Sequence, residues 1–200
     1  MKKIKKGMIA LVLVGVFLLT STTWAVTVSK DGVITMKLAH VNPVGSPTDM
    51  AANKLKDLLK ERTNGKIVIE IFPNEQLGIE KAALQGVVVG TIDLSLNDAA
   101  YVADLFSPMG VLDFPYVYRD WAHYEAMLTS KVYQDLADAA YKKVGAKFIA
   151  PYLFGRRMLC SNKPVKSPED AKGLKIRTPG SELAMENARV LGGVPRLIWD

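Results

Sequence analysis

The stretch KIVIEIF (66–72) decides the fold class, because its β-branched and aromatic residues predict a β-strand. Residues 73–78 (PNEQLG) follow with the proline, asparagine and glycine that are typical of turns. Residues 80–89 then predict a helix, and residues 91–96 predict a further strand. Strands that alternate with helices indicate an α/β fold around a mostly parallel sheet.

The alternation continues on the N-terminal side of this stretch. Residues 33–39 predict a strand, and Ser46 followed by Pro47 is typical of a helix start. Apolar residues recur at helical spacing from there to the triplet 63–65, whose glycine is expected to end the helix.

Two further helices are predicted in the second half of the chain. The aromatic stretch before them, residues 111–118, is expected to form a loop or an irregular segment. Asp120 can cap the first helix, which runs through Leu128, and Ser130 can cap the second, which ends at Gly145.

Residues 147–154 and 158–161 are expected to be extended. Cys160 lies in the second of these segments and is interpreted as a small buried apolar residue. Ser167 predicts the start of a short helix with acids in its first turn, where the helix dipole favours them, and Gly173 is expected to end it.

The stretch GLKIRTPGSE (173–182) predicts a strand, a sharp turn and a helix start at Ser181. Arg177 therefore stands at the carboxyl end of a strand, beside the amino terminus of a helix. Ligands of α/β proteins bind at this edge, where a guanidinium group and free backbone N–H groups can hold an anion. The alternative is an arginine that pairs with a neighbouring acid.

Residues 1–25 have the features of a cleavable signal peptide. A basic start precedes an apolar run, residues 8–20, and Thr23-Trp24-Ala25 supplies a cleavage site. The apolar run is shorter than the roughly 20 residues that a helix needs to span a bilayer. We therefore expect cleavage after Ala25 and no membrane-spanning segment in the mature chain.

Removal of that segment lowers the formal net charge from +6 to +2, because it contains four lysines and no acid. The remaining chain has no basic run of the kind that binds phosphate backbones, so no nucleic-acid partner is expected. A single cysteine excludes an intramolecular disulfide, and no cysteine stands at the cleavage site to carry a lipid. These features favour a soluble periplasmic protein.

The sequence contains none of the common catalytic motifs. Its two histidines, His40 and His123, lie far apart and lack the spacing of metal ligands, so no metal is expected. Neither a nucleophile elbow nor a glycine-rich phosphate loop is present. We therefore expect neither an enzyme nor a cofactor.

Four segments stand in the order in which a known protein family carries them: KIVIEIFPNEQLG (66–78), GTIDLSLND (90–98), LDFPYVYRD (112–120) and GRRMLCSNKPVKSPEDAKGLKIRTPGS (155–181). Together with the signal peptide, they resemble the periplasmic solute-binding proteins of tripartite ATP-independent periplasmic (TRAP) transporters, dicarboxylate-type branch. The resemblance extends over about residues 34–194.

The resemblance implies a two-lobed α/β periplasmic binding protein of the type II-like class, without enzymatic activity and without a cofactor. Such a protein closes on an organic acid, either a sugar acid or a small dicarboxylate, and delivers it to an ion-driven TRAP permease in the membrane. Residues 26–150 are then the first lobe, with the aromatic loop and the helices, and residues 151–200 are part of the second lobe.

The resemblance also implies an arginine pair in the ligand site. In the family, the arginine of the K-[IL]-R-x-P motif forms a bidentate salt bridge with the ligand carboxylate, and Arg177 falls on it. Lysine cannot copy that geometry. A second family arginine precedes the S/T-N-[KR] stretch, which places it at Arg157, with Arg156 as the reserve candidate. The alternative is that one or both of these arginines lie at the lobe surface.

Further site residues follow from the same resemblance. Asp98 falls where family members hydrogen-bond hydroxyl or amino groups of the substrate. Because an acid repels a second carboxylate, Asp98 favours a hydroxylated or sugar-derived monoacid over a plain dicarboxylate. His40 and Asn42 fall where the family contributes polar contacts. Aromatic residues are expected to wall the cleft, although they are more often core residues: Phe154, Tyr152 and Phe114.

The chain departs from the family pattern after residues 191–195. There the family continues with a strand, a helix, a polar motif that completes the ligand site, and a long helix that braces both lobes, whereas here residues 196–200 end the sequence. We therefore expect a truncated chain or one with a frameshifted tail. As a complete product, such a chain would expose a sheet edge and apolar surface, and would bind ligand poorly.

Two other interpretations remain open. An exported α/β binding protein of another transporter class, or of a receptor, would close in the same way without an arginine pair as carboxylate clamp. Tight binding of a neutral sugar or a metal would favour that interpretation. An exported enzyme of the same fold class would show turnover, and the lack of a positioned nucleophile, base or metal set argues against it.

Overall fold

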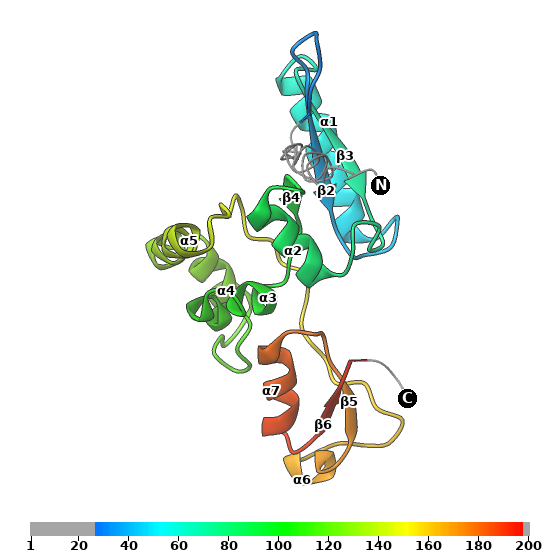
Figure 1. The fold of residues 1–200 in the computed structure, drawn as a ribbon. Coiled ribbons are helices and arrows are strands. Elements are labelled where there is room, and N and C mark those ends of the chain that lie inside the picture. Colours follow the sequence, from blue (N-terminus) through cyan, green and yellow to red (C-terminus); the bar gives the residue numbers. More distant parts are fainter. Residues whose placement is uncertain (1–26, 198–200) are drawn as a thin grey trace, which may run out of the picture.

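The computed structural model of the protein describes residues 27–197. The expected signal peptide, residues 1–25, lies outside the described residues, and so does the tail 198–200. Figure 1 shows a larger body that contains the first sheet and most of the helices, and a smaller body near the C-terminus that contains a second sheet. No helix in the described part of the chain is both long and apolar enough to cross a membrane.

The first sheet is built around β2 (Ile34–Ala39). β3 (Ile67–Phe72) pairs in parallel with β2 over its whole length. On the opposite side, β1 (Thr27–Val28) pairs antiparallel with the start of β2, and β4 (Leu94–Ser95) pairs in parallel with its end. The prediction of a mostly parallel α/β sheet is confirmed, although β4 is shorter than the predicted strand.

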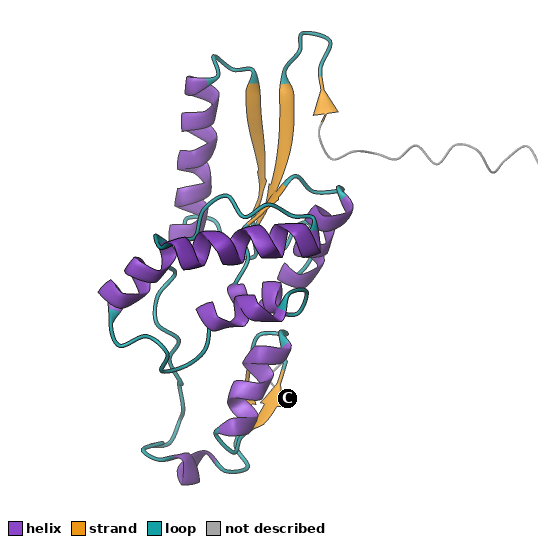
Figure 2. Ribbon diagram, turned by 90° about the vertical axis from the view of Figure 1, so that its left-hand side faces the viewer, coloured by secondary structure: helices purple, strands orange, loops and turns teal. Residues whose placement is uncertain are grey.

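Helix α1 (Pro47–Arg62) packs against one face of this sheet, as Figure 2 shows. The Oγ atom of Ser46 caps the helix by accepting a hydrogen bond from the backbone N–H of Asp49 at 3.2 Å. Leu38 of β2 and Ile69 of β3 form the core beneath the helix, each only 1% exposed. The predicted start of this helix is confirmed.

Helix α2 (Glu80–Val89) packs on the opposite face of β2, where Ala39 contacts Ala83. Gly86 leaves room on this helix for Ile92, because a Cβ atom at Gly86 would lie 2.7 Å from the Ile92 Cδ1 atom and the Ile92 side chain would have to shift. Successive side chains of a strand point to opposite faces of the sheet, so Leu38 packs under α1 and its neighbour Ala39 packs under α2. The predicted bounds of this helix are confirmed.

A helical layer follows β4. It consists of α3 (Ala99–Ala103), the 3-10 helix η1 (Ser107–Leu112), α4 (Trp121–Leu128) and α5 (Lys131–Val144). These helices share one core with α2, and its buried members are Leu84, Val102, Met109, Leu112, Tyr133 and Ala140. The local pattern did not predict α3 and η1, because elements this short depend on the core that they share.

The predicted caps of α4 and α5 are confirmed. The Asp120 carboxylate accepts a hydrogen bond from the backbone N–H of His123 at 2.8 Å. The Ser130 hydroxyl accepts one from the backbone N–H of Tyr133 at 3.2 Å. Gly145 ends α5 with φ at 83°, a left-handed conformation that favours glycine.

The second sheet contains β5 (Lys175–Arg177) and β6 (Val194–Arg196), which pair in parallel. The short helix α6 (Pro168–Ala171) precedes β5, and α7 (Glu182–Val190) leads from β5 to β6. The expected strand, turn and helix start around Arg177 are confirmed. The strand β6 was not predicted.

Residues 146–166 run from the larger body to the smaller one without any helix or strand. The segments 147–154 and 158–161, which were expected to be extended, form no strand, because neither pairs with a strand among residues 27–197. Cys160 is exposed, so its interpretation as a buried residue is wrong. Most residues of the segment 147–166 are exposed, because no helix or sheet in the described part of the chain packs over it.

Candidate functional site

A salt bridge between distant parts of the chain marks the candidate site. One guanidinium nitrogen of Arg157, Nη2, lies 2.6 Å from the Oδ2 atom of Asp98 and 3.5 Å from the Oδ1 atom of Asp113. Asp98 stands between the carboxyl end of β4 and the start of α3, and Asp113 directly follows η1. The structure thus brings together two of the residues predicted for the site, Arg157 and Asp98. The carboxyl end of a parallel strand is also the expected place for a ligand.

Glu80 completes this acidic cluster from the first turn of α2. Its carboxyl group accepts a hydrogen bond from the backbone N–H of Asp98, and its backbone carbonyl accepts one from the side-chain amide of Asn97 at 3.0 Å. The pKa of Glu80 is raised to about 7: burial is the main cause and the Asp98 charge adds to it, whereas the Asp98 N–H and the Arg157 charge oppose the rise.

Sequence reasoning missed Glu80. The available signal was an acid in the first turn of a helix that directly follows a glycine-containing turn, residues 73–78. That pattern occurs on the surface of many proteins, where the helix dipole alone accounts for it. Only the packing of α2 against the start of α3 places this carboxyl group beside Asp98.

Asp113 was also missed, and it contributes the third carboxyl group. Burial raises its pKa, the Asp98 charge adds to that rise, and Arg157 opposes it. The Oδ2 atom of Asp113 is buried and has no hydrogen-bond partner among the described residues. The Arg157 guanidinium group therefore contacts two of the three carboxyl groups, Asp98 and Asp113, and its charge also acts on Glu80.

Tyr101 of α3 links this cluster to the smaller body. Its hydroxyl oxygen accepts a hydrogen bond from the backbone N–H of Gly180, in the turn after β5, at 2.8 Å. Burial raises the pKa of Tyr101, the charges of Glu80 and Asp98 add to the rise, and the charge of Arg177 opposes it. Tyr101 is therefore within electrostatic reach of both the acidic cluster and Arg177.

A second contact holds the same two elements together. The backbone N–H of Glu182, the first residue of α7, donates a hydrogen bond to Asp104 Oδ1 at 3.1 Å. The other carboxylate oxygen of Asp104 lies 3.6 Å from the Lys81 ammonium group. A cavity of about 520 Å³ opens beside these contacts; its lining includes Lys81, Asp104, Phe114, Glu182, Leu183 and Met185.

Arg177 is exposed at the carboxyl end of β5. Among residues 27–197 it forms neither a hydrogen bond nor an ion pair, so its pairing with a neighbouring acid finds no support there. The next residue, Thr178, is buried, and its Oγ1 atom has no partner in the described part of the chain. Both groups stand at the end of β5 that faces Tyr101.

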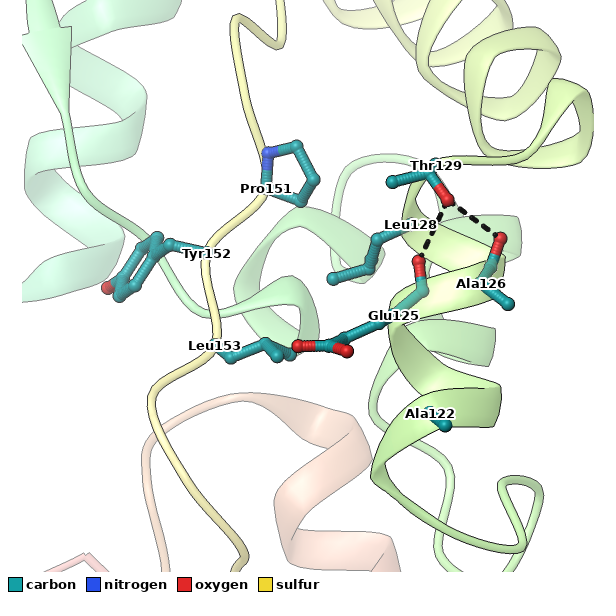
Figure 3. A pocket seen from close by; sticks show the side chains of 8 residues that line it. All are labelled: Ala122, Glu125, Ala126, Leu128, Thr129, Pro151, Tyr152 and Leu153. Atoms are coloured by element: carbon teal, nitrogen blue, oxygen red, sulfur yellow. Dashed lines mark hydrogen bonds between the residues drawn. The ribbon is translucent and has the colours of Figure 1, made fainter.

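The aromatic residues of the segment 146–166 differ in position. Figure 3 shows that the ring of Tyr152 points away from α4, whereas Leu153 points toward Glu125 of α4. Burial raises the pKa of Tyr152, and Glu80 and Asp98 add to the rise, so its hydroxyl group is near the acidic cluster. Phe154 is 68% exposed.

The cavity drawn in Figure 3, about 520 Å³, lies between α4 and this segment and is bordered mainly by apolar side chains and by Glu125 and Thr129. It contains none of the arginines predicted for the site. Arg156 is exposed and contacts no acid among the described residues.

His40 and Asn42 lie in the loop between β2 and α1. The side chain of His40 is fully buried, with Nε2 3.3 Å from the Oδ1 atom of Asp49. Asp49 also accepts a hydrogen bond from the backbone N–H of Gly45 at 2.9 Å, so the pair holds the loop before α1. Asn42 is half-buried, and its backbone carbonyl accepts a hydrogen bond from the N–H of Asn74 at 3.0 Å. His40 and the backbone of Asn42 thus support the loop, and the contact of either side chain with a ligand stays a prediction.

No group of three potential metal ligands in the described residues is arranged to hold a metal ion. The site instead combines carboxyl groups, guanidinium groups and tyrosine hydroxyls. This set of donors and acceptors suits a ligand that carries both a carboxylate and hydroxyl groups.

Comparison with known proteins agrees with this chemistry. A family model described as bacterial extracellular solute-binding protein, family 7, matches residues 38–198. The 2,3-diketo-L-gulonate-binding periplasmic protein YiaO of Escherichia coli (strain K12) is 40% identical over 147 residues, which are 73% of this chain and 44% of that protein.

Two solved structures have a similar fold. A TRAP periplasmic solute binding protein from Xanthobacter autotrophicus Py2 with bound beta-D-galacturonate matches with a TM-score of 0.77 and 31% identity, over 82% of this chain and 54% of that one. Another from Haemophilus influenzae RdAW with bound L-gulonate matches with a TM-score of 0.75 and 28% identity, over 81% and 53%. The chain thus spans about half the length of these proteins.

Proposed function

Because this chain belongs to the bacterial extracellular solute-binding proteins of family 7, we propose that it forms part of a periplasmic protein that captures an organic acid for a TRAP-type permease. The membership confirms the resemblance seen in the sequence, and the similar solved structures confirm the α/β fold of a periplasmic binding protein. Proteins of this family bind solutes for transporters. We propose that this one likewise binds its ligand without chemical turnover.

The observation that carries the proposal is the position of two arginines around one tyrosine. Arg157 contacts Asp98, whose charge acts on Tyr101, and the charge of Arg177 acts on the same hydroxyl group from the other body. The planar guanidinium group of Arg177 has unused N–H donors, and these could bind a carboxylate that lies between the two bodies. Arg157 would add further N–H donors, since a guanidinium group has five.

The acidic cluster indicates which acids fit. Glu80, Asp98 and Asp113 repel a second carboxylate but accept hydrogen bonds from hydroxyl groups. We therefore propose a polyhydroxy monocarboxylate, such as a sugar acid, rather than a plain dicarboxylate. The ligands named for similar proteins, 2,3-diketo-L-gulonate, beta-D-galacturonate and L-gulonate, support this choice.

Residues 26–150 and 151–200 are proposed to belong to two lobes that close on the ligand, with residues 1–25 as a cleavable signal peptide for the periplasm. Permease subunits in the membrane are the proposed protein partners. The contacts of Tyr101 and Asp104 with the β5–α7 turn show that the two bodies adjoin each other here, which closure on a ligand requires.

Calorimetric titration of the protein with a panel of solutes tests the function. We expect D-galacturonate or L-gulonate to bind more tightly than succinate, and neutral D-galactose to bind at least tenfold more weakly than its acid, because it lacks the carboxylate that the arginines recognise. Galactose binding as tight as galacturonate binding would contradict the carboxylate site. Tighter binding of succinate would contradict the choice of a monocarboxylate.

A further inference from the structure

The candidate site carries more negative than positive charge before a ligand arrives. Glu80 and Asp98 meet at the start of α3, Asp113 joins them through Arg157, and Arg157 is the guanidinium group in contact with these acids. With all three acids ionised, the cluster has a formal charge of −2. An anionic ligand bound beside it adds another negative charge within a partly buried space.

Other charged groups around Glu80 do not remove this excess. Tyr101 of α3 and Tyr152 of the connecting segment face it as neutral hydroxyls, and burial raises the pKa of both. Lys81, the next residue on α2, points to Asp104 instead, with its ammonium group 3.6 Å from the carboxylate. The charge of Arg177 acts on Tyr101, and Arg177 is the group that the ligand carboxylate is proposed to neutralise.

Glu80 is the group in this cluster best placed to give up its charge. Among the described residues, Arg157 forms its ion pairs with Asp98 and Asp113, and Glu80 forms none with it, although the Arg157 charge acts on Glu80. Its hydrogen-bond donor is the backbone N–H of Asp98. A carboxyl group needs just one acceptor-capable oxygen for that bond, so its other oxygen can carry a proton and donate to a ligand oxygen.

We propose that this site binds one proton together with its anionic ligand, and that Glu80 carries the proton. The inference rests on the proposed function, because it requires an acid as the ligand. The proton removes one of the negative charges that the ligand carboxylate would otherwise face, and it turns Glu80 into a hydrogen-bond donor for the ligand.

The direction of the pH dependence follows from the free protein. The pKa of Glu80 is about 7 before the ligand binds, and a neighbouring anion raises it further. Below pH 6 the proton is already present in the free site, and no uptake at Glu80 is expected. Between the free and the bound pKa, the affinity falls by up to about tenfold for each unit of rising pH.

Calorimetry in buffers of different ionisation enthalpy tests the proposal directly. D-galacturonate is titrated into the protein at pH 8 in phosphate and in Tris, and the observed enthalpy is plotted against the buffer enthalpy. We expect the slope to show uptake of more than half a proton per ligand at pH 8 and a smaller uptake at pH 6. The affinity is expected to be about fivefold higher at pH 6 than at pH 8.

The variant Glu80→Gln keeps the shape of the side chain and an oxygen that accepts from the Asp98 N–H. We expect it to bind D-galacturonate without proton uptake and with equal affinity at pH 6 and pH 8. Glu61→Gln, an exposed carboxylate near the end of α1, is the matched control and should keep the uptake of the parent.

Each outcome separates this inference from the proposed function. Binding by the parent protein without buffer-dependent enthalpy at pH 8 overturns the proton uptake and leaves acid binding intact, whether or not the variant folds. Uptake that persists in Glu80→Gln overturns the role of Glu80. Failure of the parent to bind any acid of the panel overturns the proposed function, and the proton uptake falls with it.

Discussion

Arg177 has a setting that is unusual for an arginine. It stands at the end of a strand, and within residues 27–197 it has neither an ion-pair nor a hydrogen-bond partner. A guanidinium group costs little to keep in water, but its planar fork is fully used only by a carboxylate or a phosphate group. We therefore assign most of the specificity for a carboxylate to this residue.

The substitution Arg177→Lys tests that assignment. It keeps the charge and replaces the fork by a point charge, so we expect at least tenfold weaker binding of D-galacturonate, which corresponds to about 1.4 kcal/mol. Calorimetric titration measures the change. Arg62→Lys, at the exposed end of α1, is the control and should bind like the parent. If Arg177→Lys binds D-galacturonate as tightly as Arg62→Lys does, Arg177 does not contact the ligand.

His40 shows how a polar residue in the right loop can serve the fold. Its side chain is completely buried, and Nε2 lies 3.3 Å from the Asp49 carboxylate. Asp49 in turn accepts from the backbone of the loop before α1. The other ring nitrogen of His40, Nδ1, is buried and has no hydrogen-bond partner among the described residues, so the Asp49 contact satisfies one of the two ring nitrogens.

At the scale of elements, capping residues define most helix starts within residues 27–197. Ser46, Asp120, Ser130, Ser167 and Ser181 each accept a hydrogen bond from the first turn of the helix that follows. Such caps act within a few residues, and this locality is why these starts could be predicted from the sequence.

Removal of one cap should have a measurable cost. In Ser130→Ala, α5 loses the acceptor for the backbone N–H of Tyr133, whose side chain is 8% exposed in the core of the helical layer. We expect a loss of about 1 kcal/mol in the free energy of unfolding, measured by urea denaturation. Ser107→Ala, an exposed serine at the start of η1, is the control and should change stability by less than about 0.5 kcal/mol. If the free energy of unfolding of Ser130→Ala changes as little as that of Ser107→Ala, the cap does not stabilise α5.

At the scale of the whole molecule, few contacts join the larger body to the smaller one. The contacts of Gly180 with Tyr101 and of Glu182 with Asp104 lie on one side, and the segment 146–166 crosses between the bodies. Bodies that share so few contacts can change their relative position at low cost, because little buried apolar surface has to be exposed.

Ligand binding should therefore make the molecule more compact. We expect the radius of gyration from small-angle scattering to decrease when saturating D-galacturonate is added, because the ligand is proposed to contact Arg157 of one body and Arg177 of the other. The same sugar-acid concentration should leave Arg177→Lys less compact. An unchanged radius for the parent protein at confirmed saturation would contradict closure.

The sequence by itself determined the local elements and the family. Periodicity, turn residues and caps predicted β2, α1, β3, α2, α4, α5, β5 and the start of α7, because these signals act between residues close in the chain. The ordered segments 66–78, 90–98, 112–120 and 155–181 identified the family for the same reason. They also pointed to Asp98, Arg157 and Arg177.

Only the tertiary structure decided which charged groups share one space. Glu80 and Asp113 are ordinary acids in the sequence, and packing places them beside Asp98 and Arg157. The same packing buried His40 and left Cys160 exposed. Burial and long-range proximity depend on how whole elements fit together, so no local pattern encodes them. The pKa of Glu80, about 7, exists only because the fold takes this carboxyl group out of water.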